Sequence, residues 1–235
     1  KEYRTVIEIG VTTDTYDSMG ETTETAGSAD VTRVQVERAL ESFHGDILQV
    51  PPMYSALKKG GQRLYDLARK GVEAEREPRS VTVHGIDLVS FEPPFVTVDI
   101  HCGRGFYVRS LAHDLGQTLG CGGHMKSLER RRVGPFRVED ALDVESFDEI
   151  FEGETWLDHL HGADIALGGM RAIVAGGELR KLVLDGRPIP PSVRIAAATP
   201  EERCRIYTSD GQFIAIARFD PDDRRWKPEK VFHPS

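Results

Sequence analysis

The sequence lacks the features that mark disulfide-stabilised, zinc-bound or membrane-spanning proteins. It has three cysteines, Cys102, Cys121 and Cys204, whose odd number and wide spacing suit neither a disulfide framework nor a four-ligand zinc site. No apolar run approaches the roughly 20 residues that cross a bilayer, and the first residues show no signal-peptide pattern. These absences predict a globular cytoplasmic protein with reduced thiols, no metal and no membrane association.

The chain also lacks an overall excess of positive charge. It has 30 Lys and Arg against 38 Asp and Glu, which gives a net charge of −8. One block departs from this balance, because residues 101–137 carry seven basic and two acidic side chains, whereas residues 138–175 carry one and ten. A solvated face is the ordinary account of such a block, and a surface for nucleic-acid phosphates is the alternative.

Hydrophobic periodicity outlines an alternation of strands and helices. Strand-like patterns cover residues 3–11, 79–102 and 206–217, the last around an Asp-Gly turn, and helical patterns cover residues 32–44, 62–70 and 108–119. The pattern predicts a mixed α/β (α+β) fold in which a largely antiparallel sheet is flanked by helices. Gly168 and Gly169 mark a boundary before a β-rich C-terminal module of about 60 residues, near the lower size limit for independent stability.

Several candidate chemistries can be set aside. Cys121 and His124 lie three apart on a glycine-rich loop without a third metal ligand nearby. The Gly-x-Gly at Gly103 and Gly105 lacks the third glycine of a dinucleotide loop and the Lys-Ser/Thr pair of a P-loop. Asp185 is a turn residue by its context, and no Gly-x-Ser-x-Gly occurs.

Residues 103–109, Gly-Arg-Gly-Phe-Tyr-Val-Arg, remain as a candidate for binding. The glycines allow a ligand to approach the backbone, an aromatic ring can stack on a base, and Arg104 and Arg109 supply positive charge. The competing interpretation is an ordinary turn from strand to helix with a core aromatic residue. For Tyr107 the two interpretations are equally weighted.

Five segments carry the motifs of one known family in that family's order. Lys-x-Tyr and Gly-x-x-Thr-Asp-Thr-x-Asp stand at residues 1–3 and 10–17, and Pro-Pro-Met-Tyr-Ser-Ala-Leu-Lys stands at 51–58. Residues 102–109 are similar to Cys-Ser-Lys-Gly-Thr-Tyr-Ile-Arg, and residues 128–136 to Leu-Arg-Arg-Thr-Arg-Val-Gly-x-Phe. By these motifs the chain resembles the bacterial tRNA pseudouridine-55 synthases, the TruB family, over nearly its full length.

The resemblance has departures. The smaller ones are Gly103, Arg104, Phe106, Val108, Glu129 and Arg131. The larger one concerns the family's catalytic aspartate, which lies in a Gly-x-Leu-Asp-Pro-x-Ala motif upstream of the Lys-x-Tyr strand, whereas the sequence given starts at Lys1. Asp14 and Asp185 match only isolated positions of that motif. We therefore expect a fragment of a longer protein, inactive by itself.

The resemblance implies isomerisation of a T-loop uridine of tRNA (position 55) to pseudouridine, without a cofactor or a metal. The catalytic residues that it implies are Tyr3, Arg109 and Leu128. Tyr3 would stack on the flipped base and is implicated in proton removal at carbon. Arg109 would pair with the catalytic aspartate and hold it ionised, and Leu128 would form an apolar wall.

The implied partner is the T-arm of tRNA, gripped by a thumb insertion at residues 49–71, and a monomer is expected. The RNA-binding residues are predicted to be Tyr54, Lys58, Lys59, Arg63, Arg104, Tyr107, Arg130, Arg131 and Arg132. Residues 1–170 would be a partial catalytic domain that includes the thumb, and residues 171–235 a small β-barrel module like a PUA domain.

Three alternatives stay open. The missing aspartate favours a non-catalytic role in binding structured RNA or as a tRNA chaperone. An unrelated α/β enzyme or a protein-interaction module would not bind structured RNA at low salt. A modification enzyme working with guide RNA, as in archaeal and eukaryotic relatives, ranks lower because the thumb and C-terminal module look bacterial.

Overall fold

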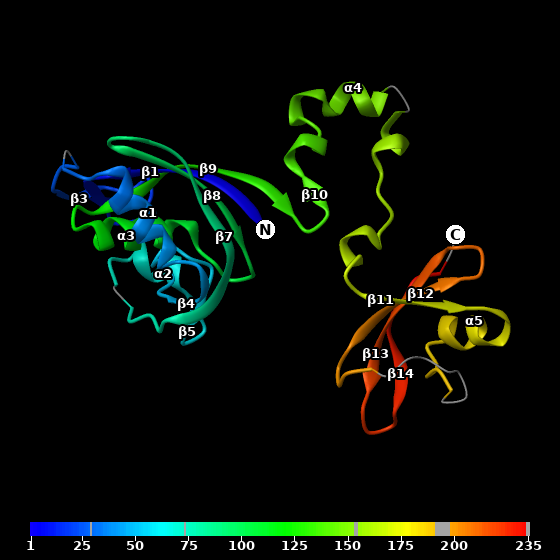
Figure 1. Cartoon of the computed structure of the whole chain (residues 1–235). Helices are drawn as coiled ribbons and strands as arrows, with labels where there is room; N and C mark the ends of the chain where they lie inside the picture. The colour runs from blue at the N-terminus through cyan, green and yellow to red at the C-terminus, as the bar shows by residue number, and fades with distance from the viewer. Residues whose placement is uncertain (29, 73, 153–154, 191–197, 234–235) are drawn as a thin grey trace. The chain divides into compact units, whose positions relative to one another are not determined.

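The computed structural model describes residues 1–28, 30–72, 74–152, 155–190 and 198–233 (Figure 1). Contacts between residues divide the chain into two compact units, residues 1–141 and residues 142–235. Each unit has its own buried apolar cluster, so each is described by itself.

A six-stranded sheet with antiparallel pairing throughout forms the centre of the first unit. In spatial order its strands are β10 (Phe136–Arg137), β9 (Gly123–Val133), β1 (Glu2–Ile9), β8 (Phe95–Cys102), β7 (Arg79–Glu92) and β4 (Gly45–Gln49). In β1, Tyr3, Thr5, Ile7 and Ile9 are buried and the residues between them are half-exposed. This alternation turns one face of β1 towards the core.

Two helices contribute to the same core, α1 (Arg33–Glu41) and α3 (Val108–Leu119), as Figure 1 shows. Thr32 and Gln35 form a capping box at the start of α1, within the helical pattern predicted for residues 32–44. Leu111, Ala112 and Leu115 of α3 are fully buried, and Gly120 ends this helix at a φ of 74°. The mixed α+β class predicted from the sequence is confirmed.

Two predicted elements differ in extent from those observed. The strand expected over residues 3–11 is interrupted at Gly10, whose φ is 93° and where a Cβ atom would lie 2.9 Å from the carbonyl carbon of Gly27. The chain then turns into the hairpin of β2 (Val11–Thr13) and β3 (Thr22–Thr25).

The helix expected over 62–70 is shorter, α2 (Leu64–Ala68), because Gln62 and Arg63 form β6 (Gln62–Arg63) and pair with β5 (Lys58–Lys59). The intervening Gly60 and Gly61 both have positive φ, which closes this hairpin.

The second unit contains a four-stranded sheet, and its core includes buried side chains such as Ile206, Ile214 and Trp226. Its strands are β11 (Arg171–Ala175), β12 (Arg203–Thr208), β13 (Phe213–Asp220) and β14 (Arg225–Val231), with α5 (Gly177–Leu184) after β11. The predicted Asp-Gly hairpin joins β12 to β13 and is confirmed. Among the residues that the structure describes, no closed barrel is formed.

Short helical turns make up the acidic segment that precedes this sheet. They are η1 (Val138–Asp140), η2 (Val144–Ser146), α4 (Phe147–Glu152), η3 (Thr155–His159) and η4 (Ile165–Leu167). In the part of the chain that is described, no helix is long and apolar enough to cross a membrane.

Asp114, a half-buried residue of α3, should make the stability of the first unit depend on pH. Burial raises the pKa of its carboxyl from 3.8 to about 6. A folded-state pKa above the unfolded one means that the folded state binds the extra proton, so stability falls as pH rises from about 4 to about 6. Allowing for solvent screening of this half-buried group, we expect Asp114→Asn to raise the free energy of unfolding at pH 7 by about 1 kcal/mol.

Urea unfolding at pH 7 and pH 4 would measure this effect, with Asp87→Asn as an exposed control. The increase in the free energy of unfolding caused by Asp114→Asn should nearly vanish at pH 4, where the Asp114 carboxyl of the folded wild-type protein is mostly protonated. A variant less stable than wild type at pH 7 would contradict the expectation.

Candidate functional site

A cavity of about 370 Å³ opens in the first unit between β1, β9 and the N-terminal end of α3. Five residues predicted from the sequence line it: Tyr3, Tyr107, Arg109, Leu128 and Arg130. Its remaining lining residues are Lys1, Gly105, Phe106, Val108 and Met125. Residues from three distant parts of the sequence therefore share one cleft.

Strand pairing explains why Tyr3, Leu128 and Arg130 meet. β9 runs antiparallel beside β1, with Tyr3 opposite Arg130 and Thr5 opposite Leu128. Residues opposite one another on paired strands lie on the same face. The Arg130 guanidinium lies 5.7 Å from the centre of the Tyr3 ring, within the range of a cation–π contact.

The turn before α3 brings Arg109 to the same cavity. Gly105 has a φ of 83°, a conformation that glycine adopts readily, and it lets the chain leave β8 and enter the helix within a few residues. Arg109 is the second residue of α3.

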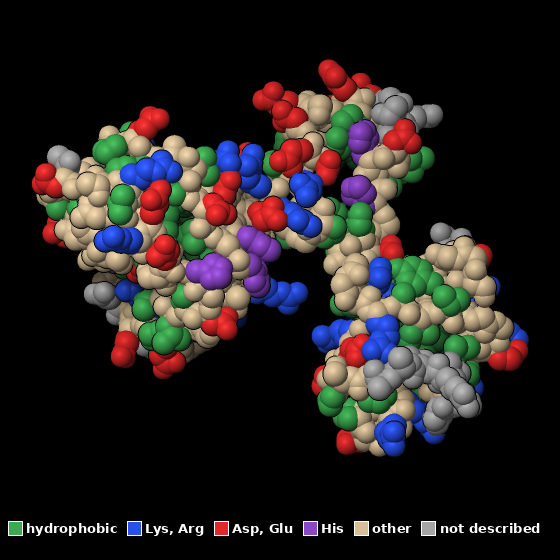
Figure 2. Space-filling view, in the orientation of Figure 1, with side chains coloured by type: hydrophobic (Ala, Val, Ile, Leu, Met, Phe, Trp, Pro, Cys, Tyr) green, Lys and Arg blue, Asp and Glu red, His purple; other side chains and the backbone are tan. Residues whose placement is uncertain are grey.

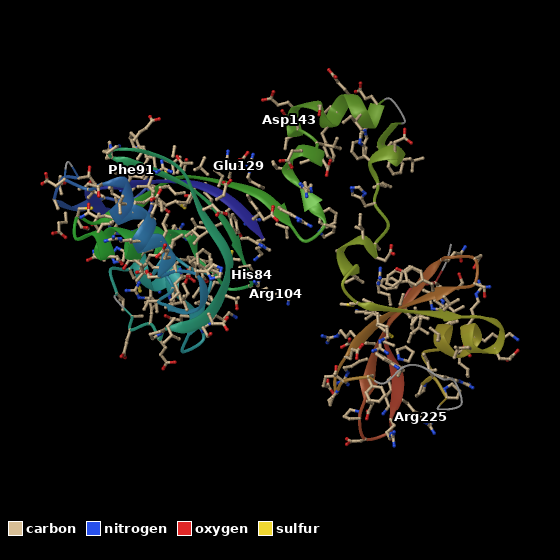
Figure 3. The ribbon with its side chains drawn as sticks, in the orientation of Figure 1. His84, Phe91, Arg104, Glu129, Asp143 and Arg225 are labelled. Carbon is tan, nitrogen blue, oxygen red and sulfur yellow. The ribbon has the colours of Figure 1, made fainter. Side chains whose placement is uncertain are left out.

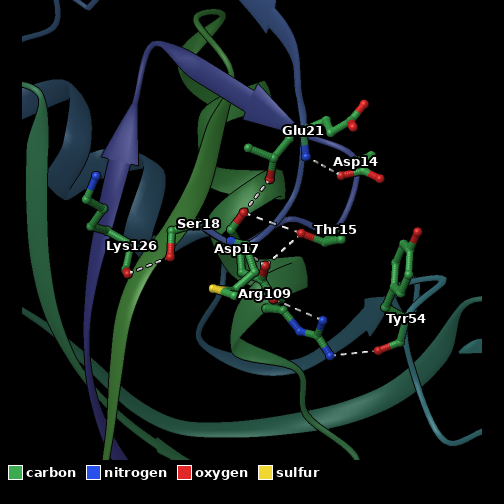
Figure 4. Close-up of polar contacts among 10 residues, drawn as sticks. Asp14, Thr15, Asp17, Ser18, Glu21, Tyr54, Arg109 and Lys126 are labelled. Atoms are coloured by element: carbon green, nitrogen blue, oxygen red, sulfur yellow. Dashed lines mark hydrogen bonds and ion pairs between the residues drawn. The ribbon is translucent and has the colours of Figure 1, made fainter.

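Two contacts hold the Arg109 guanidinium (Figure 4). Nη1 donates to Oδ2 of Asp17 at 3.1 Å, and Nη2 donates to the carbonyl oxygen of Tyr54 at 2.7 Å. The side chains of Arg109 and Asp17 are 25% and 17% exposed, so the pair is largely withdrawn from water. An arginine has five N–H donors, and these two contacts leave others for a further carboxylate.

Sequence reasoning missed Asp17 as a functional residue. The signal was present, since Asp17 closes the Thr-Asp-Thr-x-Asp motif, but the sequence does not show which side chain it meets. In the structure, Oδ1 of Asp17 accepts hydrogen bonds from Oγ1 of Thr15 at 2.6 Å and from the backbone N–H of Met19 at 3.1 Å. Its carboxylate is thereby fixed on both oxygens.

The base of the predicted thumb is fastened to the start of α3. The buried Gln49 side chain accepts from the Tyr107 N–H at 2.8 Å and donates to the Tyr107 carbonyl oxygen at 3.0 Å. The Ser110 hydroxyl donates to the Val50 carbonyl oxygen at 2.7 Å. Tyr107 therefore lines the cavity, and its backbone anchors the base of the predicted thumb, while the neighbouring Phe106 is the aromatic residue packed against the core.

Of the predicted RNA-binding residues of the thumb whose side chains the structure describes, none lines this cavity. Tyr54 contributes its carbonyl oxygen to Arg109, and Lys58 lines a separate cavity of about 190 Å³ beside α2. Arg63 donates to the hydroxyl of Tyr65 at 2.7 Å. Lys59 belongs to β5, and its side chain lies outside the described part of the structure.

The basic block is only partly free to bind anions. Arg131 lies 3.3 Å from a Glu129 carboxylate oxygen, and Arg132 pairs with Glu2 at 3.2 Å. Arg104 is exposed in the loop after β8 and does not line the cavity (Figure 3). Figure 2 shows basic and acidic side chains interspersed on the visible face of this unit. Of the three arginines at 130–132, only Arg130 lines the cavity, where it lies over the Tyr3 ring.

Solved structures share this fold. The chain of a Cbf5–Nop10–Gar1 complex matches all of this chain and 67% of its own length, with a TM-score of 0.74 and 21% sequence identity. A structure of an H/ACA ribonucleoprotein bound to a substrate RNA containing 2'-deoxyuridine matches with a TM-score of 0.70 at 18% identity. At these identities the comparison defines the fold class alone.

Sequence comparisons define the family. Residues 1–108 match the TruB family pseudouridylate synthase N-terminal domain, and residues 109–184 match the tRNA pseudouridylate synthase B C-terminal domain. The tRNA pseudouridine synthase B of Dehalococcoides mccartyi strain 195 is 38% identical over 232 residues, which cover 99% of this chain and 76% of that protein. The protein of the same name from Pseudomonas aeruginosa strain UCBPP-PA14 is 42% identical over 98% of this chain and 75% of its own length.

The chain belongs to the TruB family of pseudouridylate synthases, and it spans about three quarters of the length of these relatives. The predicted family and enzyme class are confirmed. The family is one of isomerases that convert uridine in tRNA to pseudouridine.

Proposed function

We propose that this chain forms the substrate pocket of a tRNA pseudouridine synthase acting on uridine 55 of the T-loop. The observation that supports the proposal best is the meeting of Tyr3, Arg109 and Leu128 in one cavity. In the reaction the uracil leaves its ribose, turns, and rejoins through carbon instead of nitrogen. The reaction is an isomerisation, so its atoms and electrons balance without a co-reactant.

The target base must first leave its stack, at a cost of about a few kcal/mol. Tyr3 offers a ring on which the flipped base can stack, which returns about 1–3 kcal/mol. Leu128, which lines the same cavity, would supply an apolar wall, and Arg130 adds positive charge beside the ring.

Arg109 would hold the catalytic carboxylate in its ionised form. A carboxylate in a closed pocket resists ionisation because of desolvation, and a fixed guanidinium opposes that effect. Asp17 and the Tyr54 carbonyl hold the guanidinium while leaving N–H donors free. The family's Gly-x-Leu-Asp-Pro motif does not occur in residues 1–235, so we propose that the carboxylate comes from a segment beyond them.

We further propose that the protein acts as a monomer in the cytoplasm and binds the T-arm of tRNA. Residues 1–170 would serve as the catalytic part with the thumb at 49–71. Residues 171–235 would serve as a PUA-like RNA-binding module, a role that suits the separate small β-rich core of the second unit.

The proposal is tested with two proteins. One is the chain itself, and the other, called the extended chain below, is the same chain preceded by a segment that carries the family's Gly-x-Leu-Asp-Pro-x-Ala motif. We expect both to bind tRNA and only the extended chain to form pseudouridine, at position 55. An extended chain whose motif aspartate is changed to asparagine is the matched control and should be inactive.

Binding of tRNA by both proteins without pseudouridine formation would overturn the proposal and favour the non-catalytic alternative. Failure of both to bind tRNA at low salt would point to an unrelated function.

Arg130 should contribute more to RNA affinity than its paired neighbours. Each phosphate contact adds about 0.7–0.9 to the slope of log affinity against log salt concentration. We expect Arg130→Ala to weaken tRNA binding and to reduce this slope by about 1. Arg132→Ala should reduce the slope less than Arg130→Ala does, because Glu2 already neutralises the Arg132 guanidinium. Arg131→Ala should also reduce the slope less than Arg130→Ala does, because Arg131 lies beside Glu129. Filter binding between 50 and 200 mM salt measures all three, and equal slopes for the Arg130 variant and wild type would contradict the assignment.

A further inference from the structure

Tyr16 holds a backbone conformation that is unfavourable for its type. Its φ is 63°, in the left-handed region, and it is one of three non-glycine residues with positive φ among those described. For a bulky residue this conformation costs about 1–2 kcal/mol, and such residues persist only where surrounding contacts hold them. Tyr16 directly precedes Asp17, the partner of Arg109.

The ring of Tyr16 stacks flat on His113. The ring centroids are 3.9 Å apart and the planes are inclined by 11°. His113 lies four residues after Arg109 on α3, so both side chains project from the same side of that helix. The stack therefore joins the loop that carries Asp17 to the helix that carries Arg109.

The loop is also tied to β9, by backbone bonds and by the Ser18 hydroxyl, which donates to the Lys126 carbonyl oxygen at 3.2 Å (Figure 4). The Met125 N–H of β9 donates to the Tyr16 carbonyl oxygen at 2.9 Å, and the Ser18 N–H donates to the Met125 carbonyl oxygen at 3.0 Å. These bonds fix the loop on β9, and its side-chain contacts with α3 include the Tyr16–His113 stack and the Asp17–Arg109 pair. The Asp17–Arg109 contact is a single hydrogen bond, so the ring stack adds a second side-chain contact between the same loop and helix.

His113 keeps its ring in place without a hydrogen bond to Nδ1. This nitrogen is buried and has no hydrogen-bond partner among the described residues. Burial, assisted by the positive charge of Arg76, lowers the pKa of His113, so the ring is neutral at pH 7. Its main contact is thus the stacked face that it offers to Tyr16.

We propose that Tyr16 and His113 are positioning residues whose stacked rings hold residues 14–20 against α3, so that Asp17 keeps the Arg109 guanidinium directed into the cavity. The catalytic consequence rests on the proposed function, whereas the effect on Arg109 does not. The strained backbone at Tyr16 thus occurs together with the ring stack and the backbone bonds to Met125, the kind of surrounding contacts that hold such a conformation.

Four variants separate ring stacking from general stability. Tyr16→Asn removes the ring with a residue that tolerates positive φ, and His113→Ala removes the other ring. Tyr16→Phe and His113→Phe keep a flat ring at each position and serve as conservative controls. The first readout is the ¹⁵N–¹H signal of the Arg109 Nε–H group in residues 1–235, which needs no activity. The second is kcat and KM for tRNA in the extended chain.

We expect Tyr16→Asn and His113→Ala to shift or broaden the Arg109 signal and to lower kcat about 10-fold, with KM within about twofold of wild type. Both Phe variants should keep the Arg109 signal and kcat close to those of the wild-type protein. Unchanged Arg109 signals in Tyr16→Asn and His113→Ala, in folded protein, would overturn the inference. So would a loss of the signal in both Phe variants, since the stack would then not be the cause. An inactive wild-type extended chain would count against the proposed function alone, and the Arg109 signal would still decide the positioning role.

Discussion

Replacing Arg109 by lysine should lower kcat of the extended chain by at least about 100-fold while tRNA binding stays within a few-fold of wild type. The guanidinium contacts Asp17 and the Tyr54 carbonyl with two different nitrogen atoms. A lysine ammonium keeps the charge but cannot reproduce this planar geometry and still meet a further carboxylate. Losing a fixed donor that stabilises charge in an active site typically costs a factor of 10² to 10³. Single-turnover pseudouridine formation with saturating enzyme measures the effect.

Two controls accompany the lysine variant. Asp17→Asn keeps the size of the partner and removes its charge, so we expect an intermediate loss in kcat. Arg132→Lys changes an arginine that pairs with Glu2 outside the cavity, and it should leave kcat near wild type. A lysine variant that retains wild-type kcat would show that Arg109 does not orient a catalytic group.

The second large effect is expected at Tyr3. This side chain is 7% exposed and lines the cavity beside Arg130. Tyr3→Phe keeps the ring for stacking and removes the hydroxyl, which the family resemblance implicates in proton removal. General acid–base groups contribute about 10² to 10⁴ in rate, so kcat should fall at least about 100-fold with the dissociation constant for tRNA unchanged.

Tyr3→Leu is the comparison for this variant, because it removes the ring as well. Loss of base stacking should then weaken tRNA binding about 10-fold in addition to the loss in kcat. Urea unfolding identifies any part of the effect that comes from core packing, because Tyr3 also belongs to the buried cluster. If Tyr3→Phe retained wild-type kcat, the hydroxyl would have no part in proton transfer and Tyr3 would be a stacking residue only.

The arrangement around Arg109 links the thumb to the pocket. The Tyr54 carbonyl belongs to the segment where the thumb begins, and Gln49 and Val50 fasten that segment to α3. RNA contacts of the kind proposed for the thumb would therefore act close to the guanidinium. This proximity follows from the fold, since Tyr54 and Arg109 are 55 residues apart in sequence.

The sequence by itself determined the elements that local chemistry controls. The capping box at Thr32 and Gln35, the apolar face of α3, the alternating residues of β8 and the Asp-Gly hairpin all follow from short-range pattern, and the structure has each of them. The family motifs identified Tyr3, Arg109 and Leu128 as candidates in advance. Each of these signals lies within a few residues, so no long-range contact was needed to read it.

Only the tertiary structure decided which side chains meet. Asp17 and Arg109 are 92 residues apart, and no periodicity indicates that a loop after β2 contacts the first turn of α3. The structure likewise showed that Arg131 and Arg132 lie beside acidic residues while Arg130 lies over Tyr3, although the three are adjacent in a basic run. The physical reason is the antiparallel pairing of β1 with β9, whose register selects one arginine of the run for the cavity and leaves the others to pair with carboxylates elsewhere on the sheet.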